Sequence, residues 1–180
     1  MVVWQLNFDV DNYTMLVTKE EEACDLLRFD GTSEIETWKP IEVEKADRAK
    51  LSNATCLYSS AIPVFDEKVL DIVKDLIKDS VEILPLDFDG KKLYAINVIK
   101  VLNCLDYEKS EYIKFDDSDR IMVIEKYVFK EECVKGHHIF KIIDEPEGGA
   151  FVSDEFRDLV LMSCLTGFKF VKAWDSSEEY

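Results

Sequence analysis

The fold is decided by the stretch Val81-Glu82-Ile83-Leu84-Pro85-Leu86-Asp87-Phe88-Asp89-Gly90-Lys91-Lys92-Leu93-Tyr94-Ala95-Ile96-Asn97-Val98. Two runs rich in apolar residues flank Asp89-Gly90, a dipeptide that tolerates the two positive φ angles of a type I′ turn. We therefore expect Val81–Phe88 and Lys91–Val98 to form a β-hairpin. Pro85 cannot donate a backbone hydrogen bond, which favours an edge strand or a bulge at that position.

One helix is predicted before this hairpin in the sequence and another after it. The first runs from Asp66, whose carboxylate can cap it, to Lys78. The second begins after Ser153, a second capping residue, and is expected to end at Gly167. In both helices the apolar residues recur at helical spacing, so each helix has one face that can pack on a sheet.

The remaining segments predict further strands. Residues 1–17 alternate imperfectly between apolar and polar, as a half-buried strand does. Residues 120–130 and 138–144 are rich in β-forming side chains, and we expect them to pair with each other. We expect residues 168–171 to form a strand or extended segment at an edge of the sheet. Directly after residues 1–17, Thr18-Lys19-Glu20-Glu21 has the pattern of a capping box. It predicts a short helix that ends at Gly31.

These elements indicate an α+β fold with a mainly antiparallel sheet, two or three covering helices and a single domain. Residues 1–60 form the N-terminal part of the domain, with a strand, a short helix and loops. Residues 61–173 form its α+β core. The acidic residues 174–180 are expected to be a disordered tail.

Charge restricts the partners of the chain. There are 38 acidic and 22 basic residues among 180, and the formal net charge is −16. A surface of this charge repels nucleic acid and anionic membranes, so neither is an expected partner. It favours a basic protein partner instead. Composition leaves the oligomeric state open.

Cysteine usage and the N-terminus bear on location. The five cysteines are odd in number and form no C-x-x-C pair, which excludes the usual zinc and dithiol motifs. Four of them neighbour apolar residues, as small buried thiols do. The first residues carry no secretory signal pattern, and no run of about 18 apolar residues occurs in the chain. A cytoplasmic location is the simplest interpretation.

No catalytic signature is present. His137 and His138 are adjacent on an expected strand, where neighbouring side chains point to opposite faces. Asp116-Asp117-Ser118-Asp119 lacks the glycine and the distal glutamate of a calcium-binding loop and is expected to be a solvated turn. The phosphate-binding, nucleophile-elbow and zinc-protease motifs do not occur. We therefore predict no catalytic residue, no cofactor and no metal.

An ordered series of segments in the C-terminal two-thirds resembles a known family. The segments are Ile62-Pro63-Val64-Phe65, Ile83-Leu84-Pro85-Leu86, Asn97 through Ser110, His138-Ile139-Phe140, Phe151-Val152-Ser153-Asp154 and Gly167-Phe168-Lys169-Phe170. In order and spacing they resemble the myxobacterial-type immunity protein domain of polymorphic toxin systems, over about residues 60–173. Lys141 stands where an arginine is expected, so no functional residue is carried over at that position.

The resemblance implies an immunity protein, which binds and neutralises a cognate bacterial toxin domain. Given the acidic balance, that domain is expected to be basic and its active site to be covered by an acidic face. We place the contact in the segment of residues 106–119, where tyrosines supply area and carboxylates supply charge. The residues predicted to bind the partner are Asp106, Tyr107, Glu108, Glu111, Tyr112, Asp116, Asp117 and Asp119.

Two other classes of function stay open on the sequence. The first is a cytoplasmic adaptor or scaffold that associates through an open sheet edge at the Pro85 strand or at residues 168–171. The second is a small enzyme whose atypical site is built from carboxylates or cysteines, which would require a pocket of convergent titratable groups.

Within residues 97–110, Leu105 is expected to anchor a loop in the core. Asp106 and Ser110 are expected to accept hydrogen bonds from nearby backbone amides.

Overall fold

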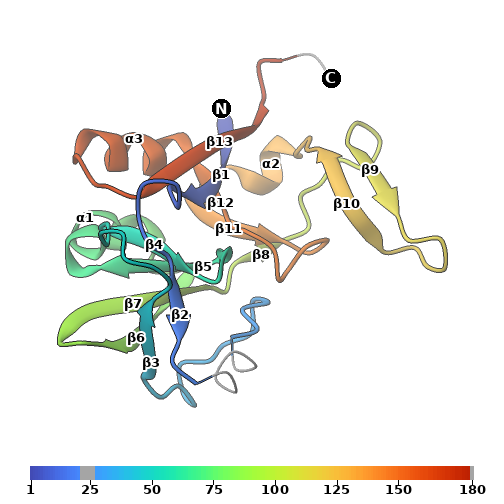
Figure 1. Cartoon of the computed structure of the whole chain (residues 1–180). Helices are drawn as coiled ribbons and strands as arrows, with labels where there is room; N and C mark the ends of the chain where they lie inside the picture. The colour runs from blue at the N-terminus through green and yellow to red at the C-terminus, as the bar shows by residue number, and fades with distance from the viewer. Residues whose placement is uncertain (21–26, 179–180) are drawn as a thin grey trace.

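The predicted hairpin forms part of a closed barrel. In the computed structural model, which describes residues 1–20 and 27–178, β6 (Val81–Phe88) pairs with β7 (Lys91–Val98) along its whole length (Figure 1). Asp89 and Gly90 have φ angles of 40° and 74°, as the turn prediction requires. The barrel order is β2 (Leu16–Thr18), β3 (Ile41–Lys45), β6, β7, β5 (Ser59–Asp66) and β4 (Ala54–Leu57).

Pro85 occupies neither a sheet edge nor a bulge, contrary to the prediction. Strand β6 has β7 on one side and β3 on the other, and its register with β7 is unbroken. The pairing with β3 covers only Leu86 and Asp87. Pro85 precedes the two residues of β6 that pair with β3. No β3 residue lies opposite it, so its missing N–H group leaves no β3 carbonyl without a hydrogen bond.

A second sheet of five strands lies against the barrel. Most of its pairs are antiparallel, and only β8 and β11 run parallel. β13 lies at one edge, as predicted for residues 168–171, and pairs with β1. The sheet order is β13 (Phe168–Asp175), β1 (Val2–Phe8), β12 (Phe151–Ser153), β11 (Ile139–Ile142) and β8 (Val101–Leu102).

Strand β13 continues past residue 173 to Asp175, two residues into the stretch expected to be the tail. Trp174 is buried there, in contact with the core.

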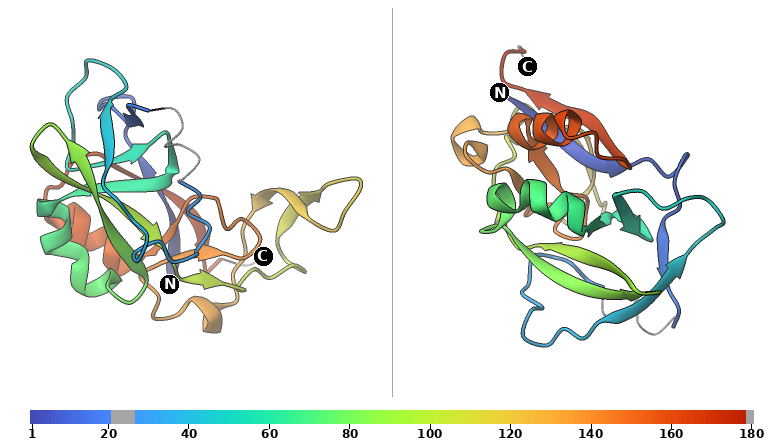
Figure 2. Two further views of the ribbon diagram at one scale, coloured as in Figure 1. Left: turned by 90° about the horizontal axis from the view of Figure 1, so that it is seen from below. Right: turned by 90° about the vertical axis from the view of Figure 1, so that its left-hand side faces the viewer.

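Both predicted helices are present, with the predicted N-caps. α1 (Glu67–Ile77) begins where the Asp66 carboxylate accepts from the Val69 amide at 2.9 Å. α3 (Asp154–Met162) begins where the Ser153 hydroxyl accepts from the Phe156 amide at 3.2 Å. The two helices lie side by side (Figure 2).

Gly167 does not end α3, contrary to the prediction. Ser163 caps the C-terminus of the helix, and Cys164 follows it with a φ angle of 53°. Gly167 lies further on and serves the contact between the barrel and the five-stranded sheet. There Asn53 Oδ1 accepts from the Thr166 amide at 3.1 Å, and Ala54 N donates to the Thr166 carbonyl at 3.1 Å.

Several strand predictions are corrected. Residues 1–17 form two strands, β1 and β2, that belong to different sheets. The expected pairing of residues 120–130 with 138–144 is wrong, because β10 (Ile121–Lys126) pairs with β9 (Glu111–Lys114) and β11 pairs with β12 and β8. β9 is not among the strands predicted from the sequence. Between β10 and β11 is a third helix, α2 (Glu131–Val134).

Residues 21–26 of the helix predicted between Thr18 and Gly31 lie outside the described part of the chain. At its expected ends the prediction is wrong, because Thr18 is the last residue of β2 and residues 27–31 are not helical. Among the described residues, no helix is long and apolar enough to cross a membrane.

Three buried apolar clusters hold these elements together. One draws on all six barrel strands, with Leu16, Val64 and Leu84 at its centre. A second joins the barrel to α1 and α3. The third lies between the five-stranded sheet and the chain around β9 and β10, and includes Phe129 and Phe140. The fold is therefore α+β, mainly antiparallel and a single domain, as predicted.

Candidate partner-binding site

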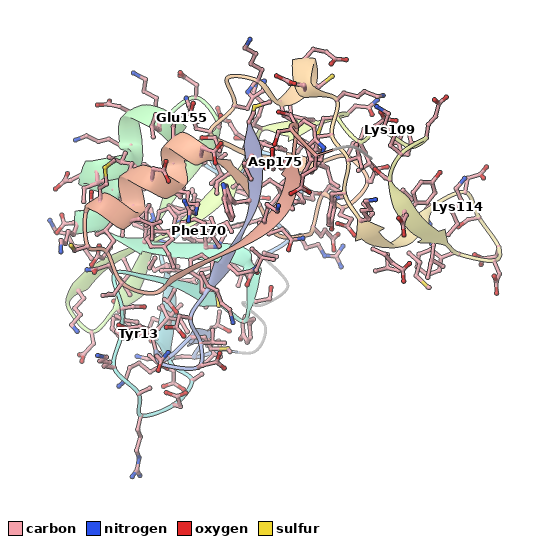
Figure 3. All side chains as sticks on the ribbon, turned by 90° about the horizontal axis from the view of Figure 1, so that it is seen from above. Tyr13, Lys109, Lys114, Glu155, Phe170 and Asp175 are labelled. Atoms are coloured by element: carbon pink, nitrogen blue, oxygen red, sulfur yellow. The ribbon has the colours of Figure 1, made fainter. Side chains whose placement is uncertain are left out.

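Strands β9 and β10 form a two-stranded arm that stands away from the rest of the molecule (Figures 1 and 2). We call residues 111–126 the arm. Its two strands are antiparallel, and Ile113 lies opposite Val123 in their register. Figure 3 shows Lys114 in this projecting part, at the far end of the molecule from Tyr13.

The base of the arm is fixed by the residues that the sequence predicted as anchors. Leu105 is fully buried and bridges to Phe129. The Ser110 hydroxyl accepts from the Val128 amide at 3.0 Å, and Asp106 Oδ1 accepts from the Glu108 amide at 3.2 Å. The predicted structural roles of Leu105, Asp106 and Ser110 are confirmed, and they hold the arm to the core through backbone contacts.

The arm exposes large apolar side chains. Four of them lie at or near its outer half. The most exposed of the four is Met122, at 51%. Singly exposed apolar residues are ordinary, whereas a group on one projecting element marks an interaction surface. The group consists of Ile113, Phe115, Met122 and Val123.

The two predicted tyrosines meet beside the arm. The rings of Tyr107 and Tyr112 lie edge to face, with centroids 6.1 Å apart. The Tyr107 hydroxyl donates to Asp144 Oδ1 at 2.8 Å, which ties the tyrosine pair to the turn that follows β11. Burial, together with this hydrogen bond to the Asp144 carboxylate, raises the pKa of Tyr107 to about 12.

Some of the predicted acidic residues form ion pairs and three others are exposed. Asp119 pairs with Lys114 at 3.3 Å, and Glu111 pairs with Lys126 at 3.5 Å. Glu108, Asp116 and Asp117 are exposed. The structure thus brings Tyr107, Tyr112 and Asp119 to one pocket, whereas Asp106 lines a different pocket and the other predicted acids line neither.

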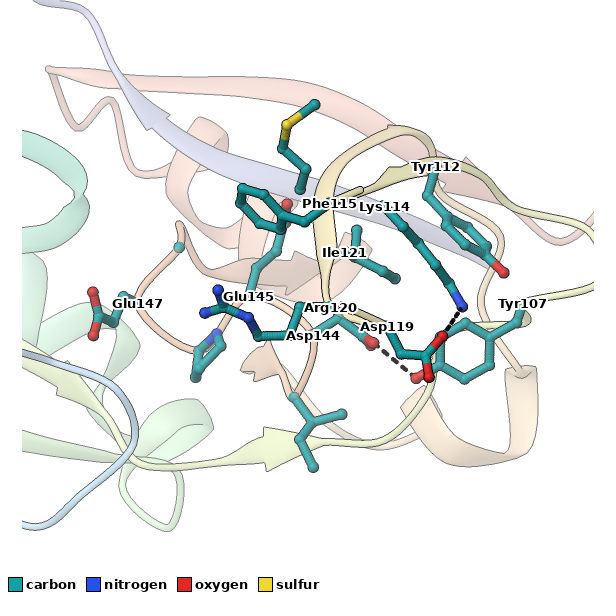
Figure 4. Close-up of a pocket in the computed structure, with 14 residues that line it drawn as sticks. Tyr107, Tyr112, Lys114, Phe115, Asp119, Arg120, Ile121, Asp144, Glu145 and Glu147 are labelled. Carbon is teal, nitrogen blue, oxygen red and sulfur yellow. Dashed lines mark hydrogen bonds and ion pairs between the residues drawn. The ribbon is translucent and has the colours of Figure 1, made fainter. Parts of the chain in front are cut away.

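That pocket lies between the arm and the turn of residues 143–148, and its volume is about 940 Å³ (Figure 4). Sequence reasoning missed the place of this turn beside the arm, since residues 127–142 separate the two in the sequence. The only available signal was the acidic composition of Glu145-Pro146-Glu147. The lining residues are Tyr107, Tyr112, Lys114, Phe115, Asp119, Arg120, Ile121, Met122, Ile143, Asp144, Glu145, Pro146, Glu147 and Gly148.

A second tyrosine holds another carboxylate of this turn. The Tyr127 hydroxyl donates to Glu145 Oε2 at 2.9 Å, and burial together with that carboxylate raises the pKa of Tyr127. Because both tyrosines stay protonated at neutral pH, Asp144 and Glu145 each accept a hydrogen bond from a neutral donor. Their negative charges are therefore positioned without being neutralised.

The thiols and histidines lie elsewhere in the fold. Burial raises the pKa of Cys56 to about 11 and that of Cys104 to about 12, which keeps both as unreactive thiols. The prediction that four of the five cysteines are buried thiols is confirmed for these two, whereas Cys133 is half-buried, Cys164 is exposed and Cys24 lies outside the described residues. His138 Nδ1 lies 3.0 Å from the Ser153 hydroxyl and supports the start of α3. Within residues 1–20 and 27–178, no group of three His, Cys, Asp or Glu side chains could hold a metal ion.

Lys141, the residue that departs from the resembling pattern, is a buried part of the core. It is 1% exposed, and its ammonium group donates to the Phe29 carbonyl. Burial lowers its pKa to about 8, although the carboxylates of Asp30 and Glu147 oppose the shift. The position therefore anchors the segment around Phe29 and does not face a partner.

The chain is similar in sequence to a known protein family. No curated protein matches the chain. The model of the Immunity protein family (Imm11) matches residues 85–175, which is half of the chain and includes the arm, the pocket and β13. This confirms the family resemblance predicted from the sequence, although the match begins later than residue 60. The chain belongs to the Immunity protein family (Imm11).

Proposed function

We propose that this protein binds and neutralises a cognate bacterial toxin domain, with the arm and the adjoining pocket as its contact surface. The observation that carries the proposal is the exposed apolar group on the arm, within the residues that the family match covers. Apolar and aromatic side chains surrounded by polar ones are typical of the centre of a protein interface. The predicted residues Tyr107, Tyr112 and Asp119 lie beside this group.

The charge of the protein supports a basic toxin. The net charge of −16 accelerates the encounter with a positive surface, and acids around the arm orient it. Asp116 and Asp117 at the turn of the arm reach furthest from the core. A projecting acidic element of this kind enters a basic active-site cleft and excludes its substrate. The protein acts in this way by binding, in the cytoplasm of the cell that makes the toxin.

A second candidate function is an adaptor that associates through β13. This strand of eight residues pairs with β1 on one side and has no strand on its other side in the sheet order of the described residues. An open edge offers backbone groups to another chain. Sedimentation velocity at two concentrations separates the two candidates, since only the adaptor predicts self-association.

The proposed function is tested by growth of a bacterium that expresses the toxin domain encoded beside this chain. Wild-type protein is expected to restore growth. The double variant Tyr107→Ala with Asp117→Lys is expected to lose protection, because it removes an aromatic contact and reverses a charge on the arm. Circular dichroism should show an unchanged fold, since both residues are exposed.

The matched control is Tyr13→Ala with Asp79→Lys, which makes the same chemical changes away from the arm. Tyr13 lies at the far end of the molecule (Figure 3). Asp79 follows α1, which lies on the opposite side from β9 and β10 (Figure 1). It is expected to protect as the wild type does. Equal loss in both variants would assign the effect to folding or net charge. Full protection by the arm variant would move the contact to another surface.

A further inference from the structure

The pocket beside the arm has walls suited to one long side chain. Tyr107, Tyr112 and Phe115 contribute aromatic rings from the arm side. Ile143, which is 56% exposed, and Pro146 contribute apolar surface from the turn. Walls of this kind bury the methylene stem of a lysine or arginine while the charged end reaches polar groups.

The charges in the pocket favour a cation. Its lining contains four carboxylates against two basic side chains. Lys114 already pairs with Asp119 at 3.3 Å, and the Arg120 guanidinium lies over the Phe115 ring at 5.2 Å. With that ion pair set aside, the three carboxylates of the turn outnumber Arg120, the one remaining basic side chain of the lining, so the pocket keeps a net negative charge.

Asp144 supplies an independent indication. Its Oδ1 accepts from Tyr107, but its Oδ2 is buried and has no hydrogen-bond partner among the described residues. A buried carboxylate oxygen without a donor is unfavourable and is rare in folded proteins. Because this oxygen is covered in the ligand-free protein, a ligand N–H group reaches it only after the carboxylate rotates toward the pocket, and the hydrogen bond then relieves the cost of its burial.

We infer that this pocket receives an arginine side chain of the toxin, an inference that rests on the proposed function. The guanidinium group carries five N–H donors in one plane, so it can bond Asp144 and a second carboxylate of the turn together. Its flat face stacks on aromatic rings, which the pocket provides. An arginine held there fixes the orientation of the toxin against the arm.

The first experiment needs no toxin. The full chain, labelled with ¹⁵N, is titrated with N-acetyl-arginine amide and, separately, with the uncharged N-acetyl-citrulline amide. The arginine compound is expected to shift the amide signals around Tyr107, Arg120 and Asp144, and citrulline to leave them in place. The double variant Asp144→Asn with Glu147→Gln is expected to weaken this response at least fivefold. Equal responses to the two compounds, or none at these residues, would overturn the pocket assignment.

The second experiment measures the dissociation constant of the complex between the full chain and an inactivated form of the toxin domain. The Asp144→Asn with Glu147→Gln variant is expected to bind at least tenfold more weakly than the wild type. The control is Glu44→Gln with Asp75→Asn, which removes two exposed acids elsewhere and is expected to bind within twofold of wild type. Unchanged binding by the pocket variant would show that no arginine of the toxin enters the pocket.

The two experiments separate this inference from the proposed function. If wild-type protein neither binds nor neutralises the toxin, the proposed function fails, and the titration still decides whether the pocket takes an arginine side chain. If the wild type protects and both pocket experiments are negative, the immunity function stands and the pocket inference is wrong.

Discussion

Replacing Gly167 with alanine is expected to lower the free energy of unfolding by roughly 2–6 kcal/mol, the sum of a backbone and a packing penalty. Gly167 has a φ angle of 94°, which a residue with a Cβ atom adopts only under strain. A Cβ atom there would lie 1.9 Å from the Ala54 carbonyl oxygen and 2.3 Å from Ser52 Oγ. The main chain must therefore move where the barrel meets the five-stranded sheet.

The matched control for this substitution is Gly136→Ala. Gly136 has a φ angle of 80°, but a Cβ atom there would meet nothing within 4 Å. It is expected to cost only the backbone penalty, about 1–2 kcal/mol. Urea unfolding followed by circular dichroism measures both variants. Equal losses would mean that the barrel and the sheet can separate locally without a cost to the fold.

Replacing Lys141 with methionine is expected to change how stability depends on pH. The folded protein holds the pKa of Lys141 at about 8, below the ordinary value of 10.5 that applies to the unfolded chain. Between these values the unfolded chain binds a proton that the folded protein releases, so the wild type gains stability as the pH rises. The gain is about 3 kcal/mol across the whole window, from the size of the shift.

Methionine has a similar length and no charge, so the variant lacks this gain. The measurement is the difference in unfolding free energy between the two proteins from pH 7 to above 10.5. Tyr107 and Tyr127 titrate near the top of this range in the unfolded chain and above it in the folded protein, but both proteins contain them and their contributions cancel in the difference. The wild type should gain on the variant as the pH rises from 8, and the difference should be constant above 10.5. Parallel stability curves would show that Lys141 is solvated in the folded protein.

Local chemistry made part of this fold predictable. The hairpin of β6 and β7 follows from Asp89-Gly90, and the starts of α1 and α3 follow from Asp66 and Ser153. In each case the deciding hydrogen bond or φ angle lies within a few residues of the signal. The same reasoning failed at Gly167, because its positive φ serves a contact with Ala54 that is distant in sequence.

Pairing between distant segments could not be predicted from the sequence. Closure of the barrel depends on the parallel pairs of β3 with β6 and of β2 with β4, which no local turn specifies. β9 was missed because most of its residues are exposed, so Glu111-Tyr112-Ile113-Lys114 does not alternate as a half-buried strand does. The predicted tyrosines therefore had no visible partner until the structure placed Asp144 beside them.

The arm also bears on how a protein of this kind changes over generations. Nearly all side chains from Ile113 to Val123 are exposed, so they contribute little to the three buried clusters. Exchanges at exposed positions usually alter stability by less than about 0.5 kcal/mol. Substitutions can therefore accumulate in this short, continuous segment with little loss of stability. On the proposed function, a family member that must bind an altered toxin can acquire new contact residues in the arm, while the rest of its sequence stays under selection for folding.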